Sequence, residues 1–306
     1  MARSSHIRAG LPSGGLAPHR DGFLKSLGSK RPETRGTYGR ALREFLRWHE
    51  RKGIHGLTTG DVLRYKTYLA TEKGLKPVSV STYLTAVRRF CAYLVGRGLL
   101  PHNPALSVKG NRRPRAHSRA PLTAAEAEAL LAGADRDGEQ GARDFAFITL
   151  MLKCGLSEIE IIRADARDLL RLSGGAFLCV QGKGRVRKDQ QVELTPDALA
   201  AIDEYLGHRK KVRETDPLFA GTGNRTRGTR MTTRGVRDRV SELIERAGLH
   251  SRARRRITPY SLRHTAAFLL AMEGASAEEI RSRMRFGSLS TAMLYIELAK
   301  ERQNGH

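Results

Sequence analysis

A short run near the C-terminus contains residue types suited to work on a phosphodiester. In residues 257–265, ITPYSLRHT, Thr258 can cap a helix and Pro259 suits its first turn. Arg263 would then lie near the N-terminus of a helix, where backbone N–H groups and the helix dipole favour phosphate oxygens. Its planar guanidinium can donate two parallel hydrogen bonds to a phosphate. This run therefore predicts a rigid arginine that binds an anionic oxygen.

Tyr295 follows in the segment 291–296, TAMLYI. Between the two segments, Ser276 opens a capping box that predicts another helix. By itself, Tyr295 fits an ordinary aromatic side chain packed against Ile280 and Met284.

Lys183 lies between two predicted strands. Residues 176–180 and 191–194 have strand-like sequences, and Gly182-Lys183-Gly184 begins the basic connection between them. Gly-Lys-Gly is common in turns, which favours a solvated lysine. The strand–turn–strand context favours a functional one, so both interpretations stay equally open.

The charge indicates the class of partner. The 306 residues include 55 Lys and Arg against 31 Asp and Glu, a net charge of +24 spread along the chain. Such a field favours a polyanion, most commonly nucleic acid. An anionic membrane surface is the rival, but no apolar run approaches the roughly 20 residues of a spanning helix, so we expect no membrane partner.

The cysteines and the first residues indicate the compartment. Cys91, Cys154 and Cys179 are odd in number and lie among apolar neighbours, which predicts reduced core residues. No histidine pairing suggests a metal site. The first residues lack the apolar segment of a secretion signal, so we expect a cytoplasmic protein.

Composition and periodicity predict two domains and a mainly α fold with a small β-hairpin or sheet (α+β). Residues 1–20 predict a flexible basic arm, and 21–107 a helical domain. Residues 108–121 are basic and poor in apolar side chains, as in a linker. Residues 122–306 form the second domain, opened by a capping box at Thr123. Within it, residues 161–170 suggest a helix and a turn.

Basic side chains of the first domain and linker are candidates for DNA binding. The helical segments place an apolar stripe on one face and arginines mostly off it, which also fits any small helical bundle. The candidates are Arg40, Arg43, Arg47, Arg88, Arg89, Arg112 and Arg113.

The order of the C-terminal segments resembles the signature of the tyrosine recombinases, also called the phage integrase family. The shared order is L-R-H-T, a capped helix, a small-residue turn and Ser-Thr-x-x-x-Tyr. The resemblance covers about residues 20–300, is most specific at the C-terminal signature and suggests a Xer-like two-domain architecture. It implies a core-binding domain followed by a catalytic domain that cleaves DNA without metal or cofactor.

The resemblance implies a role for each matching residue. Tyr295 stands at the nucleophile, which attacks the phosphodiester and forms a 3′-phosphotyrosine. Arg263 stands at the family's second arginine, and Lys183 at the hairpin lysine, the general acid. Glu160 matches the structural glutamate of a G-L-R-x-x-E turn. His264 is expected to be a structural histidine.

Three positions depart from the family's pattern. Ser157 stands where the family has its first arginine, Tyr260 at the first position of H-x-L-R, and Phe286 at the histidine of an L-G-H turn. Tyr260 can still donate a hydrogen bond, whereas Phe286 cannot and Ser157 has no charge. Loss of one preorganised donor typically costs about 2.7–4 kcal/mol. Arg163 and Arg285 are candidates to supply the missing charge.

Two functions follow from these residues. The first is a site-specific DNA recombinase or integrase. The alternative is a catalytically impaired or silent DNA-binding homologue that occupies recombination sites or assists an active partner. The resemblance further implies double-stranded DNA with inverted half-sites, a dimer on each site, a tetramer in synapsis and a possible partner recombinase.

Overall fold

The described residues form three hydrophobic cores, one in the first of two units and two in the second. The computed structural model describes residues 15–28, 32–54, 56–111, 120–182, 184–249 and 257–304. Internal contacts divide the chain into Met1–Arg115 and Ala116–His306. The division falls inside the stretch 108–121 expected to be a linker, of which residues 112–119 lie outside the described residues, as do residues 1–14. The bounds of the domains stay a prediction.

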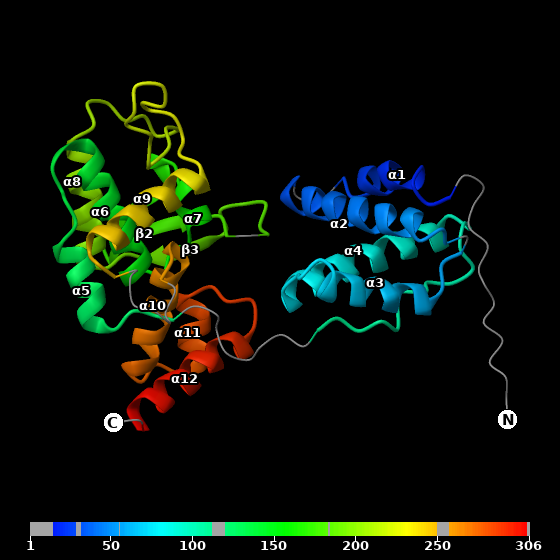
Figure 1. Cartoon of the computed structure of the whole chain (residues 1–306). Helices are drawn as coiled ribbons and strands as arrows, with labels where there is room; N and C mark the ends of the chain where they lie inside the picture. The colour runs from blue at the N-terminus through cyan, green and yellow to red at the C-terminus, as the bar shows by residue number, and fades with distance from the viewer. Residues whose placement is uncertain are drawn as a thin grey trace. The chain divides into compact units, whose positions relative to one another are not determined.

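The first unit is a bundle of helices. They are α1 (His19–Ser26), α2 (Pro32–Arg51), α3 (Thr59–Thr71) and α4 (Pro77–Gly96), drawn in blue and cyan in Figure 1. A capping box between Thr58 and Asp61 starts α3. Phe45 and Trp48 of α2 and Tyr65 of α3 are almost fully buried against one another. The helical segments expected in this unit are therefore present, with their apolar stripes turned to the core.

The start of this unit differs from the flexible arm predicted for residues 1–20. Among residues 15–20, which the structure describes, Leu16 is buried in the core and α1 begins at His19. Phe23 in α1 is buried in the same core, where its ring stacks on Tyr38 of α2 and meets Phe90 of α4 edge-on. Packing of these two apolar side chains orders a stretch whose Gly- and Ser-rich composition suggested flexibility.

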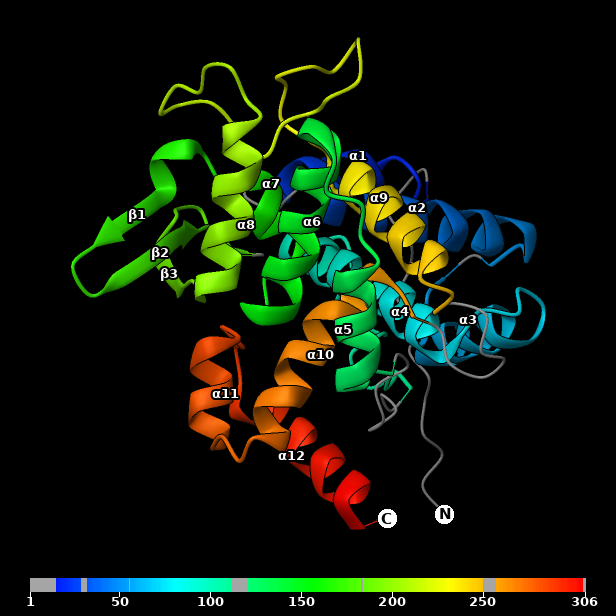
Figure 2. The ribbon, with the colours of Figure 1, turned by 90° about the vertical axis from the view of Figure 1, so that its left-hand side faces the viewer.

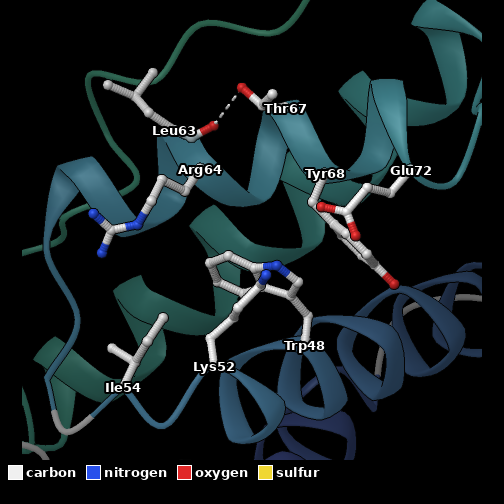
Figure 3. A pocket seen from close by; sticks show the side chains of 8 residues that line it. All are labelled: Trp48, Lys52, Ile54, Leu63, Arg64, Thr67, Tyr68 and Glu72. Atoms are coloured by element: carbon white, nitrogen blue, oxygen red, sulfur yellow. Dashed lines mark hydrogen bonds between the residues drawn. The ribbon is translucent and has the colours of Figure 1, made fainter.

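A groove of about 610 Å³ lies on the first unit, between the end of α2 and α3 (Figure 3). Its lining combines aromatic, apolar and charged side chains, namely Trp48, Lys52, Ile54, Leu63, Arg64, Thr67, Tyr68 and Glu72. Tyr68 accepts from Arg51 and donates to Glu44 Oε1 at 2.6 Å, which fixes one wall of the groove.

The second unit contains the remaining helices and the sheet (Figure 1). Its elements are α5 (Ala124–Ala132), α6 (Gly138–Lys153), α7 (Glu158–Arg163), η1 (Ala166–Asp168), β1 (Leu169–Leu172), β2 (Gly175–Val180), β3 (Gln190–Glu193), α8 (Pro196–Gly207), α9 (Thr233–Arg246), α10 (Pro259–Met272), α11 (Ala277–Arg283) and α12 (Leu289–Asn304). The buried helix α6 packs against α8 and α10. The mainly helical fold with a small sheet is thus confirmed.

The sheet has three strands among the described residues, one more than expected. The predicted pair is present, with Val180 of β2 opposite Gln190 of β3 in antiparallel register. The helix and turn predicted over residues 161–170 are wrong in part, because α7 ends at Arg163 and β1 begins at Leu169. Leu169 pairs with Leu178, so strand pairing decides a segment whose leucines also fit a helix.

The last three helices build a smaller core of their own. α12 packs on α10 and α11, and Figures 1 and 2 both show the three helices together. Phe268, Ile280, Met284 and Tyr295 are buried there. Ser276 forms the predicted capping box at the start of α11. This arrangement brings the segment after residue 257 against the segment that carries Tyr295.

No helix in the described part of the chain has the length and apolar character needed to cross a membrane. The three cysteines are free thiols, with Cys91 and Cys154 buried and Cys179 partly buried.

Candidate active site

Arg263 is held at the start of α10, as the sequence predicts. Thr258 is the N-cap, and its backbone N–H donates to Ser261 Oγ at 3.1 Å. Pro259 occupies the first turn, where its missing N–H leaves no intrahelical bond unmade. The side chain of Arg263 leaves the following turn and is 11% exposed.

The guanidinium of Arg263 is tied down by three groups from other segments. Its Nη1 donates to Gly155 O at 2.6 Å and to Glu160 Oε2 at 2.7 Å, and its Nη2 donates to Met284 O. Gly155 has a φ of +61°, and a Cβ at this position would meet the side chain of Met284 at 2.6 Å. Glycine adopts this backbone conformation without strain and leaves room for Met284, so the turn after α6 can present its carbonyl to the arginine.

Glu160 is the centre of this cluster. The backbone N–H and Oγ of Ser157, the N-cap of α7, both donate to Glu160 Oε2 at 2.7 Å. Arg285 donates from Nε to Glu160 Oε1 at 2.8 Å. Burial would raise the pKa of this carboxyl, but the charges of Arg263 and Arg285 outweigh it and lower the pKa to about 2. Glu160 is therefore a carboxylate between two guanidiniums.

Arg285 reaches the cluster from an unusual backbone conformation. Its φ is +54°, and among the described residues it is the one non-glycine residue in the left-handed region. Its Nη2 donates to Gly155 O at 2.8 Å, and its Nη1 to Arg283 O at 2.6 Å. The side chain is only 4% exposed. Two arginines thus share one carboxylate and one carbonyl.

Tyr295 lies beside this cluster in the core of the last three helices. The residue is 2% exposed, and its hydroxyl forms a hydrogen bond with Nδ1 of His264, one residue after Arg263. Its ring stacks on Phe286 at 5.6 Å between centroids, and the Arg263 guanidinium lies 5.8 Å from the centroid of Phe286. Burial raises the pKa of the Tyr295 phenol, with Tyr260 adding to the rise and Arg263 opposing it.

Tyr260 completes the neighbourhood on its more open side. It is 37% exposed, and its ring meets that of His264 edge-on at 4.6 Å between centroids. The phenol at this position therefore stands next to the histidine that contacts Tyr295.

The turn between β2 and β3 approaches α7 through Arg163. Nη1 of Arg163 lies 3.2 Å from Gly182 O and 3.4 Å from Gln181 O, at the start of the turn. Lys183 itself lies outside the described residues, so its predicted role stays a prediction. Of the two candidates to supply the missing charge, Arg163 contacts this turn and Arg285 binds Glu160.

Comparisons with known proteins show the family of this chain. A family model described as "Phage integrase family" matches residues 121–302, and one described as "Phage integrase, N-terminal SAM-like domain" matches residues 25–99. Tyrosine recombinase XerC of Chromohalobacter salexigens is 30% identical over 281 residues, covering 90% of this chain and 89% of that protein. The chain belongs to the phage integrase family.

Further relatives support the same family and fold. Tyrosine recombinase XerD of Pseudomonas aeruginosa is 27% identical over 295 residues, covering 92% of this chain and 93% of that protein. The crystal structure of XerH site-specific recombinase bound to palindromic difH substrate, a post-cleavage complex, superposes with a TM-score of 0.74 at 18% identity, covering 94% of this chain and 83% of that one. The resemblance to tyrosine recombinases and the prediction of a DNA-cleaving and rejoining enzyme are confirmed.

Within this phage integrase fold, the predicted residues form two adjoining groups. In the first group, Glu160 accepts hydrogen bonds from Ser157, Arg263 and Arg285. In the second, His264 contacts Tyr260 and Tyr295, and Phe286 stacks on Tyr295. The sequence indicated a structural role for His264 and missed its contact with the Tyr295 hydroxyl. Tyr260 could have signalled a site at His264, since residues four apart on a helix lie on the same face.

The basic side chains of the first unit divide into exposed and internal ones. Arg40, Arg43, Arg47 and Arg89 are exposed, as DNA contacts require. Arg88 instead donates from Nε to Ala105 O at 3.2 Å and from Nη2 to Val108 O at 2.7 Å. These bonds favour a structural role for Arg88, which secures the end of the unit. Arg112 and Arg113 lie outside the described residues.

No metal site is evident in the part of the chain that the structure describes. The His, Cys, Asp and Glu side chains there include no group of three or more that could hold an ion.

Proposed function

We propose that this chain cleaves and rejoins double-stranded DNA at specific sites through a 3′-phosphotyrosine formed on Tyr295. The observation that carries the assignment is the ring of Phe286, which stacks on Tyr295 at 5.6 Å and lies 5.8 Å from the Arg263 guanidinium. A phenol nucleophile and a buried phosphate-binding cation therefore flank the same side chain. Family membership supports the reaction, and the geometry supports the choice of residues.

In this proposal the Tyr295 oxygen attacks the phosphorus of a phosphodiester. A bond forms between the phenolic oxygen and phosphorus, and the bond from phosphorus to the 5′ oxygen breaks. The phosphate stays attached to the 3′ end through Tyr295, so the energy of the diester is kept. A free 5′ hydroxyl then attacks the phosphotyrosine and rejoins the strand, which requires no cofactor.

The surrounding residues divide the remaining work. Arg263 donates to a nonbridging oxygen and stabilises the charge of the transition state. Tyr260, at the more open side, donates a further hydrogen bond. Lys183 protonates the departing 5′ oxygen as the general acid. Phe286 packs against Tyr295 and contributes no hydrogen bond.

The phenol proton needs an acceptor because burial raises the pKa of Tyr295. A phenolate is not formed in advance, so the proton leaves as the oxygen attacks. His264 Nδ1 is the hydrogen-bond partner of the hydroxyl and takes the proton in the tautomer that carries hydrogen on Nε2.

The proposed partner is a DNA duplex with inverted half-sites. Two chains would occupy the two half-sites as a dimer, and two such dimers would pair as a tetramer for strand exchange, with a partner recombinase as one possible second subunit. The net charge of +24 and the exposed Arg40, Arg43 and Arg47 support phosphate contacts by the first unit. We place this activity in the cytoplasm because its substrate is DNA.

A suicide duplex tests the proposal. A DNA site recovered with the protein is nicked near the scissile position, so that a short fragment diffuses away after cleavage and the covalent complex accumulates. A denaturing gel should then show a protein–DNA band that is absent with Tyr295→Phe. Tyr205→Phe is the matched control, because it removes another buried phenolic hydroxyl of the same unit, one that accepts from Ala220 N.

The outcome also decides between the two functions derived from the sequence. A band with wild type and with Tyr205→Phe, but not with Tyr295→Phe, supports the recombinase. Specific binding without any covalent band would support the silent DNA-binding homologue, which the recombinase relatives do not favour. A band that persists in Tyr295→Phe would mean that another residue is the nucleophile.

A further inference from the structure

The backbone at Arg285 is strained for an arginine. Its φ of +54° lies in the left-handed region, where the Cβ of any residue other than glycine crowds the backbone. The resemblance places the glycine of the family's L-G-H turn at this position. Arg285 therefore carries a long side chain where glycine would fit without strain, and contacts of that side chain must offset the cost.

Three of the four hydrogen bonds of this side chain reach the candidate site. Arg285 makes four hydrogen bonds, to both oxygens of Glu160, to Gly155 O and to Arg283 O. Two of these acceptors, Glu160 Oε2 and Gly155 O, also accept from Arg263. The two guanidiniums are therefore held side by side on the same pair of acceptors.

The cluster has a surplus of positive charge. Arg263 and Arg285 bring two positive charges, and Glu160, with its pKa of about 2, brings one negative charge. All three side chains are at most 11% exposed, so water screens this surplus poorly. An anion with one negative charge, such as one phosphodiester group, would balance it.

Ser157 explains why the second guanidinium arrives from Arg285. The resemblance implies an arginine at position 157, but serine stands there and its hydroxyl donates to Glu160 Oε2 at 2.7 Å. The short serine leaves room beside Glu160, and Arg285 Nε occupies Oε1 of the same carboxylate at 2.8 Å. Arg163, the other candidate, instead lies 3.2 Å from Gly182 O.

We propose that Arg285 supplies the second phosphate-stabilising charge that position 157 lacks, so that Arg263 and Arg285, both held by Glu160, act together on the scissile phosphate. This inference rests on the proposed function. In this chain the second charge comes from a residue more than a hundred positions after the one that carries it in the family's pattern. The carboxylate that binds it, Glu160, stands at the family's position.

A reciprocal exchange of residues tests the proposal with the full-length protein and the nicked suicide duplex. Arg285→Gly relieves the backbone strain and removes the charge, and should slow formation of the covalent complex about 10²–10³-fold, the usual effect of losing one preorganised donor. Ser157→Arg combined with Arg285→Gly restores the family's arrangement and should recover most of that loss. Ser157→Arg alone should give no gain, because Arg285 already occupies the carboxylate.

A second substrate tests whether Arg285 acts through its charge or only supports the structure. In a duplex with a neutral methylphosphonate at the scissile position, one nonbridging oxygen is replaced by a methyl group, so less charge needs neutralising. Wild type and Arg285→Gly should then react at similar rates. A variant that is merely misfolded would stay slow on both duplexes. Arg281→Ala is the matched control, since it removes an exposed arginine paired with Glu278 on α11.

The outcomes distinguish this inference from the proposed function. No Tyr295-dependent product from wild type would overturn the proposed function and the two-arginine site with it. A wild-type product accompanied by an equally fast Arg285→Gly would overturn the inference alone. A deficit in Arg285→Gly that is equally large on the methylphosphonate, and that Ser157→Arg does not repair, would reduce Arg285 to a structural residue and also contradict the inference.

Discussion

Two buried carboxylates of the second unit each bind two arginines, but their charges are balanced differently. Asp144 in α6 accepts from Nε and Nη2 of Arg143 at 2.9 and 2.6 Å, and from Nε of Arg239 at 2.6 Å. Arg239 also pairs with Glu242, one turn further along α9. Arg143 and Arg239 therefore meet two carboxylates, and the group joins α6 to α9. Arg246 also pairs with Glu242, but its side chain is 57% exposed, so water screens its charge.

The Glu160 cluster has no such balance. Among the described residues, neither Arg263 nor Arg285 pairs with a carboxylate other than Glu160. A buried charge is tolerated when it is paired and hydrogen-bonded, and an unbalanced one carries a cost that a purely structural cluster would avoid. Helix packing alone accounts for the balanced group, whereas the proposed function accounts for the unbalanced one by an anion that arrives with the substrate.

Removal of each carboxylate should have the largest effect and separate the two groups. Glu160→Ala leaves Arg263 and Arg285 without a carboxylate, and Asp144→Ala leaves the buried Arg143 without one. Each should lower the free energy of unfolding by about 3–5 kcal/mol in urea titrations. Cleavage per folded molecule should be lost only in Glu160→Ala, because only that carboxylate orients the proposed phosphate-binding arginines. Equal losses of cleavage per folded molecule in both variants would contradict the comparison.

The acid stability of the Glu160 cluster should give the next largest effect. The pKa of Glu160 falls from an ordinary 4.5 to about 2 in the folded protein. A lowered pKa stabilises the fold above pH 4.5, and the contribution is lost as the pH falls toward 2. For this shift it amounts to about 3 kcal/mol.

Unfolding experiments across this pH range, on wild type and Glu160→Gln, isolate that contribution. The glutamine keeps the shape but cannot titrate, so its stability should start lower and fall less steeply between pH 4.5 and 2. The difference between the two curves removes the contributions of other carboxyls, such as Asp165, whose pKa is also lowered despite its burial because Lys188 and Arg230 bind it. Parallel curves would mean that Glu160 has an ordinary pKa.

Most of the fold could be predicted because its signals are local. The capping boxes at Thr123 and Ser276 define helix starts through residues three positions apart. The segment over residues 161–170 could not be predicted in the same way. Its leucines fit a helix or a strand equally, and pairing with β2 decided between them, which is a contact between distant residues.

In the candidate site too, contacts between residues distant in the sequence could not be predicted. The signature around Arg263 and Tyr295 can be recognised in the sequence because it consists of short motifs in a fixed order and spacing. The contact of Arg285 with Glu160 is not visible, because the sequence places it 125 residues from Glu160 and offers Arg163 as an equal candidate. Only the folded chain shows which guanidinium reaches the carboxylate. The contact between His264 and Tyr295 depends in the same way on the packing of α10 against α12.

Removal of the second arginine from each carboxylate gives the smallest expected change in stability and the sharpest test of the comparison. Arg239→Ala leaves Asp144 with Arg143 and Glu242 with Arg246, so both carboxylates keep a partner. Arg239 is also 25% exposed at its side chain, where water can replace part of its pairing. We expect a loss of only about 1 kcal/mol in the free energy of unfolding and no change in cleavage.

Arg285→Ala removes the corresponding arginine from Glu160 and leaves Arg263 in place. Its effect on stability should be similarly small, because Glu160 keeps Arg263 as its partner and alanine bears the same left-handed strain as arginine. Its effect on cleavage should be about 10²–10³-fold, since the surplus charge is gone. The two variants should therefore have similar urea midpoints. Their rates of cleavage of the suicide substrate, measured on the same preparations, should differ widely. If Arg239→Ala slowed cleavage as much as Arg285→Ala at equal stability, charge balance would not be what distinguishes the two carboxylates.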